Sequence, residues 1–60
     1  MNLDQYKHKT VKIDVERDGQ SFHYTATILY SDDRTTAFTD KFGKEIIVPS
    51  DRITFVEVVE

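Results

Sequence analysis

The stretch TVKIDVERDGQSFHYTATILY, residues 10–30, decides the fold class. Apolar and polar residues alternate on both sides of the Asp18-Gly19 pair. A period of two residues is typical of a β-strand that buries one face. An Asp-Gly pair between two alternating segments indicates a tight hairpin, because glycine readily adopts the positive φ that the turn requires. The stretch therefore predicts two antiparallel strands, one beginning at Thr10 and one over residues 22–30.

The alternation also assigns side chains to the faces of these two strands. Val11, Ile13 and Val15 share one face of the first strand. The residues expected to share one face of the second strand are Phe22, Tyr24, Ala26, Ile28 and Tyr30.

Three shorter segments, residues 35–39, 45–48 and 53–59, are predicted to be strands. Residues 40–43 suit a turn that ends in a left-handed glycine, and Pro49 ends the fourth strand because it lacks an N–H donor. Residues 50–52 suit one 3-10 turn. Five short strands joined by tight turns predict an all-β fold, a small five-stranded antiparallel barrel with a short 3-10 turn before the last strand.

The domain organisation follows from the same pattern. Residues 10–60 are expected to form a single small β-barrel domain. Residues 1–9 are polar apart from Met1, Leu3 and Tyr6, and are expected to form an N-terminal arm or a short helical turn.

Composition narrows the function classes. The 60 residues include no cysteine, so neither a disulfide nor a thiolate metal site can stabilise so small a chain. Tight packing or self-association has to do so. The net charge of −3 disfavours a binder of nucleic-acid phosphates. No apolar run is long enough to span a membrane, and no signal peptide is recognisable, so we expect a cytoplasmic protein without a membrane partner.

Residues 46–53, IIVPSDRI, resemble the end of SH3-like barrels, where a strand runs into a Pro-Ser pair, a 3-10 turn and the closing strand. In SH3 domains this resemblance implies binding of proline-rich peptides to an aromatic groove. That groove needs a tryptophan and a tyrosine just after the Pro-Ser pair, whereas this chain has no tryptophan and carries Arg52 near the tyrosine position.

The chain is also similar to the Sm-like barrels, which share the five strands. Asp18-Gly19 matches the glycine of their first hairpin, and Asp32-Asp33 matches the aspartate-bearing turn after their long second strand. This resemblance implies RNA binding. In that family an asparagine and an Arg-Gly pair bind the RNA. Of these residues this chain has only the arginine, Arg52, and lacks the asparagine and the glycine.

Two acidic patterns are candidates for metal chemistry. Residues 14–19 open like the calcium loop of an EF-hand, but its twelfth position is Thr25 and not a bidentate glutamate. We interpret these residues as a strand and a turn. Asp32 and Asp33 are adjacent carboxylates in a turn and are expected to cap backbone amides.

Ser21 and His23 lie two residues apart, with Asp18 nearby, so a hydroxyl and an imidazole could share one face of a strand. A catalytic triad also needs an oxyanion hole and a substrate pocket, for which 60 residues leave little room. We therefore expect a surface histidine. The sequence predicts no enzyme, no metal and no cofactor.

The last strand predicts an interaction surface. Its alternation places Ile53, Phe55 and Val59 on one face and Val56 and Val58 on the other, so that both faces are apolar. Residues 46–48 have the same two-sided character. An exposed apolar strand is an association hazard. Either the N-terminal arm or another chain is expected to cover it.

These patterns support a non-enzymatic interaction module that binds a protein partner or itself, as a homo-oligomer, through its last strands. The expected contacts are Val56, Val58 and Phe42, whose ring at a hairpin tip either folds back or meets a partner. The alternative is an Sm-like or SH3-like RNA-binding module. Its expected contacts are Tyr6, Lys7, Lys9, Lys41, Lys44 and Arg52.

Overall fold

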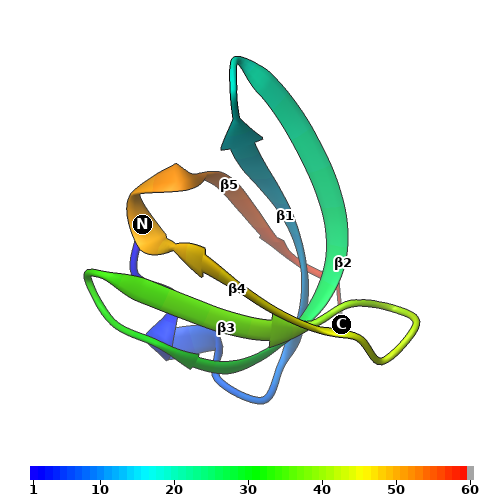
Figure 1. Ribbon diagram of the computed structural model, residues 1–60. Helices are drawn as coiled ribbons and strands as arrows, with labels where there is room; N and C mark the ends of the chain where they lie inside the picture. Colours follow the sequence, from blue (N-terminus) through cyan, green and yellow to red (C-terminus); the bar gives the residue numbers. More distant parts are fainter. Residues whose placement is uncertain (60) are drawn as a thin grey trace.

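The computed structural model describes residues 1–59 (Figure 1). In chain order the elements are the 3-10 helix η1 (Asp4–Tyr6), β1 (Thr10–Arg17), β2 (Gln20–Ser31), β3 (Thr35–Thr39), β4 (Glu45–Pro49), the 3-10 helix η2 (Ser50–Arg52) and β5 (Ile53–Val58). The predicted all-β class, its five antiparallel strands and the 3-10 turn before the last strand are confirmed. Within residues 1–59 no helix is long and apolar enough to cross a membrane.

All five strands belong to one antiparallel sheet with the order β4-β3-β2-β1-β5. The sheet curls, so that β3 and β4 lie in front of β1 and β5 in Figure 1. Among the described residues, β4 and β5 do not pair with each other, and the sheet stays open. The prediction of a barrel is therefore right only for the curl of the sheet, because within residues 1–59 no strand pairing closes the seam.

The two predicted glycine turns are confirmed. Asp18 and Gly19 both have positive φ, +53° and +78°, as a two-residue hairpin turn of the mirror-image type requires. This turn sets Arg17 opposite Gln20 and fixes the register of β1 against β2. Gly43 has φ +82° and closes the hairpin between β3 and β4.

A bulge in β2 changes the predicted faces. Ile28 pairs with Phe38 and Tyr30 pairs with Ala37, so that Leu29 is an additional residue. One extra residue moves every later side chain to the other face. The prediction that Tyr30 shares a face with Ile28 is therefore wrong: Ile28 is buried, whereas Tyr30 points outward with 44% of its surface exposed.

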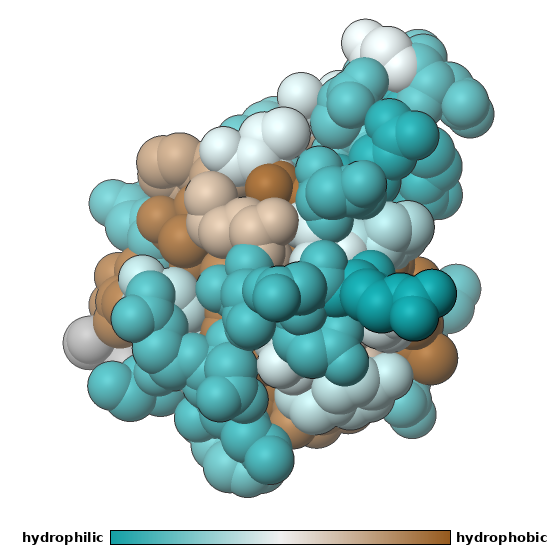
Figure 2. Space-filling view, turned by 90° about the vertical axis from the view of Figure 1, so that its left-hand side faces the viewer, coloured by the Kyte–Doolittle hydropathy of each residue, from teal (hydrophilic) through white to brown (hydrophobic). Residues whose placement is uncertain are grey.

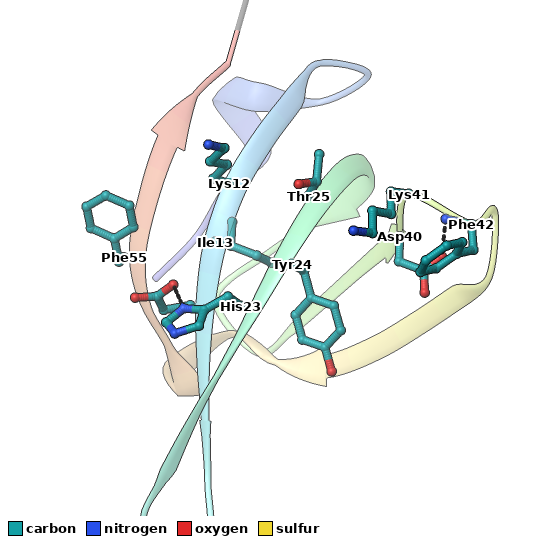
Figure 3. Close-up of a pocket in the computed structure, with 10 residues that line it drawn as sticks. Lys12, Ile13, His23, Tyr24, Thr25, Asp40, Lys41, Phe42 and Phe55 are labelled. Atoms are coloured by element: carbon teal, nitrogen blue, oxygen red, sulfur yellow. Dashed lines mark hydrogen bonds and ion pairs between the residues drawn. The ribbon is translucent and has the colours of Figure 1, made fainter.

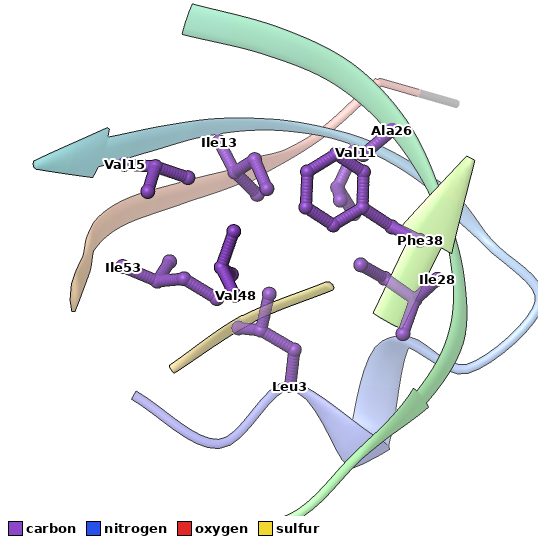
Figure 4. Close-up of a cluster of buried hydrophobic side chains, with 9 residues drawn as sticks. All are labelled: Leu3, Val11, Ile13, Val15, Ala26, Ile28, Phe38, Val48 and Ile53. Atoms are coloured by element: carbon purple, nitrogen blue, oxygen red, sulfur yellow. The ribbon is translucent and has the colours of Figure 1, made fainter. Parts of the chain in front are cut away.

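The hydrophobic core lies inside the curled sheet (Figure 4). Phe38 is the largest fully buried side chain, and the Tyr24 ring meets it edge-on at 5.2 Å between centroids. Leu3 is completely buried and Tyr6 packs against the same cluster. The arm thus fills the core and leaves the outside of β5 uncovered. The buried cluster contains Leu3, Val11, Ile13, Val15, Ala26, Ile28, Phe38, Val48 and Ile53.

A chain of hydroxyl groups ties the arm to η2. The Ser50 hydroxyl donates to the Asp32 carbonyl at 2.6 Å, so its oxygen accepts from Thr36 at 2.7 Å. The Thr36 oxygen in turn accepts from Ser31 at 2.7 Å, and the Ser31 oxygen accepts the Leu3 N–H at 2.8 Å. Because each hydroxyl has one proton, all four bonds run in the same direction. In the described chain, no buried side-chain polar atom lacks a partner.

Candidate interaction surface

The open edge of β5 carries backbone groups that point away from the sheet. The Val59 N–H donates to the Thr10 carbonyl at 3.1 Å. In an antiparallel pair, alternate residues direct both backbone groups toward the partner strand. By this alternation Phe55 and Glu57 face β1. The N–H and C=O groups of Val56 and Val58 therefore point toward the open edge, where residues 1–59 provide no neighbouring strand.

A second bulge corrects the predicted faces of this strand. Thr54 is an additional residue between the paired positions Ile53 and Phe55. Val56 and Val58 therefore lie on the same face as Ile53, toward the core, and Phe55 lies on the outer face. The prediction that Val56 and Val58 face away from Ile53 is wrong. Val56 instead packs against the core cluster.

The strand nevertheless exposes apolar surface on both of its faces. Phe55 is 46% exposed on the outer face, and Val58 is 42% exposed on the inner face, where the sheet opens. Val59, just beyond the strand, is 49% exposed. In Figure 2 the main brown apolar area lies at the left of the view, with smaller brown areas at the lower and right edges, and teal polar surface covers most of the rest. Both faces of β5 therefore expose apolar side chains, as the sequence predicts. Phe55 lies on the outer face, however, and Val58 lies on the inner face.

A shallow groove of about 570 Å³ lies between Phe55 and the hairpin that joins β3 to β4 (Figure 3). Lys12 and Thr25 line it from β1 and β2, and Phe42 lines its far side. The Phe42 side chain is 83% exposed, and the Lys41 ammonium lies 5.2 Å from the centre of its ring. The Phe42 ring therefore does not fold back onto the core.

Asp40 builds the loop that holds Phe42 outward. Its carboxylate accepts the N–H groups of Phe42 and Lys44, both at 2.9 Å. The backbone N–H of Asp40 donates to the Lys44 carbonyl at 2.9 Å, and the Gly43 N–H donates to the Asp40 carbonyl at 3.0 Å. An aspartate that binds the amides after it is a common way to order a turn. Phe42 thus projects from an ordered loop.

His23 is hydrogen-bonded to Asp14 across the two strands, with 2.6 Å between Nδ1 and Oδ1. The imidazole side chain is 75% exposed. Ser21 lies two residues before His23 on the same face of β2, opposite Glu16. The sequence reasoning missed Asp14, although the two-residue turn at Asp18-Gly19 already implied its place opposite His23. Among the described residues no hydrogen bond joins this pair to a hydroxyl group, and none of their histidine and acidic side chains form a group of three or more that could hold a metal.

The residues predicted for RNA binding do not converge on one groove. Tyr6 packs against the core, and Lys41 lines the outer groove. Arg52 lines a separate groove of about 270 Å³, where it bonds to Glu16 at 3.4 Å. The other three are Lys7 and Lys9, in the loop between η1 and β1, and Lys44, in the hairpin between β3 and β4.

The turn between β2 and β3 confirms the capping role expected of Asp32. Its carboxylate accepts the backbone N–H groups of Thr35 and Arg34, each at 2.8 Å. The hydrogen bond from Thr35, followed by that from Arg34, lowers the pKa of Asp32 below its ordinary value. Asp33 instead accepts the side-chain amide of Asn2 at 3.3 Å.

Comparisons with models of protein families, with curated proteins and with solved structures found no match to this chain. Its function has to be argued from its own surface. The features that stand out are the open edge of β5 and the exposed rings of Phe55 and Phe42.

Proposed function

We propose that the chain is a non-enzymatic protein-binding module whose partner adds a strand to the open edge of β5. The observation that carries this proposal is the set of backbone groups of Val56 and Val58 that point away from β1. Strand addition uses such groups for affinity and the alternating side chains for specificity. Phe55 and Val58 supply exposed apolar contacts on the two faces of the same strand.

The other edge of the sheet is less suited to strand addition. Pro49 ends β4 and has no N–H to donate. Glu45 places a charge at the other end of that strand. Proline and charged residues are the devices that discourage edge pairing in natural sheets. β5 also has one charged residue, Glu57, but no proline, so the proline is what distinguishes the two edge strands.

We further propose that the open sheet is an SH3-like or Sm-like barrel whose seam is left unsealed, in a protein of the cytoplasm. Support comes from the passage of β4 through Pro49 and η2 into β5, which pairs with β1. The absence of cysteine from the 60 residues agrees with a reducing compartment.

Site-specific photo-cross-linking in cells that express the chain tests the proposed binding edge. A photoreactive residue replaces Val58 on β5 or, as a matched control, Ile47, which is 62% exposed on β4. We expect protein adducts from position 58 to exceed those from position 47. Adducts that nuclease removes would support RNA binding and contradict the proposal. So would the absence of adducts at position 58.

A further inference from the structure

We propose that the partner at this edge is a second copy of the chain, whose β5 pairs antiparallel with the first across a two-fold axis at Val56. The inference rests on the proposed function and identifies its partner. It combines the direction of the backbone groups with the order of side chains along β5.

The backbone groups restrict the register. Beyond the Thr54 bulge, the residues among 55–59 that present N–H and C=O groups to the open edge are Val56 and Val58. In a two-fold antiparallel pair, an axis at Val56 sets this residue opposite itself. Each Val56 N–H then donates to the Val56 carbonyl of the other copy, which forms the closely bonded type of residue pair.

The side chains distinguish this axis from its two neighbours. An axis at Glu57 would place two carboxylates directly opposite each other, which destabilises a strand pair. An axis at Phe55 would set Val58 opposite Arg52, which lies in η2 and outside the strand. With the axis at Val56, Glu57 lies opposite Phe55 of the second copy, and Lys12 of β1 lies beside Glu57 on the same face. No like charges then face each other across the join.

The pairing covers the apolar surface that the single chain leaves exposed. Phe55 on the outer face gains a neighbouring strand, and so does Val58 on the inner face. The open sheets of both copies become one continuous sheet with β4 at each end. A join of a single strand pair is smaller than a stable interface of about 1,200 Å² or more, so the dimer is expected to be weak and to depend on concentration.

Sedimentation equilibrium of the folded chain from about 10 µM to about 1 mM, the range of weak association, tests the dimer. The average mass should rise from that of one 7.0 kDa chain toward twice that value and no further. A mass that stays at one chain over the whole range would overturn the inference. So would growth beyond two chains, because a single two-fold contact closes at a dimer and cannot add a third chain.

Two opposite charges at position 55 test the register. Phe55→Glu places a carboxylate opposite Glu57 of the second copy, and should weaken dimerisation about tenfold because two such contacts arise in a two-fold pair. Phe55→Lys places an ammonium there and should preserve or strengthen dimerisation. Ile47→Glu on β4 is the control that should leave it unchanged. Equal weakening by both substitutions of Phe55 would contradict the axis at Val56.

Val58→Pro removes an N–H that β1 does not use, so the chain should stay folded while the edge is blocked. Circular dichroism checks the fold, and the mass should remain that of one chain. If this variant unfolds, the two substitutions of Phe55 still test whether the chain dimerises with its axis at Val56.

The protein cross-linked at position 58 separates this inference from the proposed function. An adduct with the mass of two chains supports both. An adduct with a different protein supports the binding edge and overturns the second copy, and the absence of any adduct overturns both.

Discussion

Two regions of this small sheet differ in whether their polar groups have hydrogen-bond partners within the chain. Where the arm meets η2, the buried hydroxyls of Ser31, Thr36 and Ser50 form one directed chain of hydrogen bonds. At β5, the backbone groups of Val56 and Val58 face an edge without a neighbouring strand in residues 1–59. Buried polar groups need hydrogen-bond partners within the chain, whereas backbone groups at a sheet edge can pair with another chain.

The difference teaches that stability and binding are carried by different parts of the molecule. A chain of 60 residues without disulfides is expected to have a small free energy of unfolding. The arm adds to it by inserting Leu3 into the core. Substitutions near the arm should therefore change the free energy of unfolding, whereas substitutions on the outer side of β5 should change association.

The largest effect is expected from Leu3→Ala. Leu3 is completely buried, and truncating such a leucine creates a cavity that costs about 3 kcal/mol. Urea unfolding followed by circular dichroism measures the loss. Val59→Ala, at a residue that is 49% exposed, is the control and should change stability by about 0.5 kcal/mol or less. A loss below about 1 kcal/mol for Leu3→Ala would show that the arm is not part of the core.

Thr36→Val should come next. It removes the middle hydroxyl of the buried chain and leaves Ser31 and Ser50 each without one partner. An unsatisfied buried polar group costs about 1–3 kcal/mol, and we expect a loss of about 2 kcal/mol in the same unfolding measurement. Thr39→Val, on the same strand and half-buried, is the matched control with a much smaller effect. Equal losses would argue against a special role for the hydroxyl chain.

Gly19→Ala should destabilise the chain less. A Cβ at Gly19 would have no neighbour within 4 Å, so the cost comes from φ +78° alone. A side chain in this left-handed region costs about 1 kcal/mol. Gly19→Asn should recover part of the loss, because asparagine tolerates that region better. If alanine and asparagine destabilise the hairpin equally, backbone strain is not the cause.

The elements that the sequence predicts well depend on local chemistry. Asp18-Gly19, Gly43 and Pro49 act through their own backbone preferences, and the structure places turns and a strand end at these residues. The pairing of Asp14 with His23 is also predictable from the sequence, because the hairpin turn fixes the register of β1 against β2.

The rest depends on packing that no short window of sequence contains. The bulges at Leu29 in β2 and Thr54 in β5 each reverse the faces of the residues that follow them. Simple alternation along the sequence therefore places Tyr30, Val56 and Val58 on the wrong faces. The burial of Leu3 has no periodic signal either, since a single apolar residue in a polar arm defines no face.

The smallest effect is expected when low pH protonates the carboxylate of Asp32, a residue beside the hydroxyl chain. Two backbone N–H groups bind its carboxylate and lower its pKa from the ordinary value of 3.8. A carboxyl whose pKa is lower in the folded state stabilises that state when ionised. This contribution is complete above the ordinary value and disappears as pH falls through the lowered pKa.

Asp32→Asn keeps an acceptor oxygen and removes the titration. The difference in unfolding free energy between wild type and variant should therefore be constant near neutral pH and shrink as pH falls below about 3.8. Urea unfolding at a series of pH values measures it, with Asp33→Asn as the neighbouring control, whose carboxylate bonds to Asn2 instead. Because Asp32 is exposed, solvent screens its charge and the effect is small. A difference that stays constant down to about pH 2 would show that the two amide bonds do not favour the ionised form.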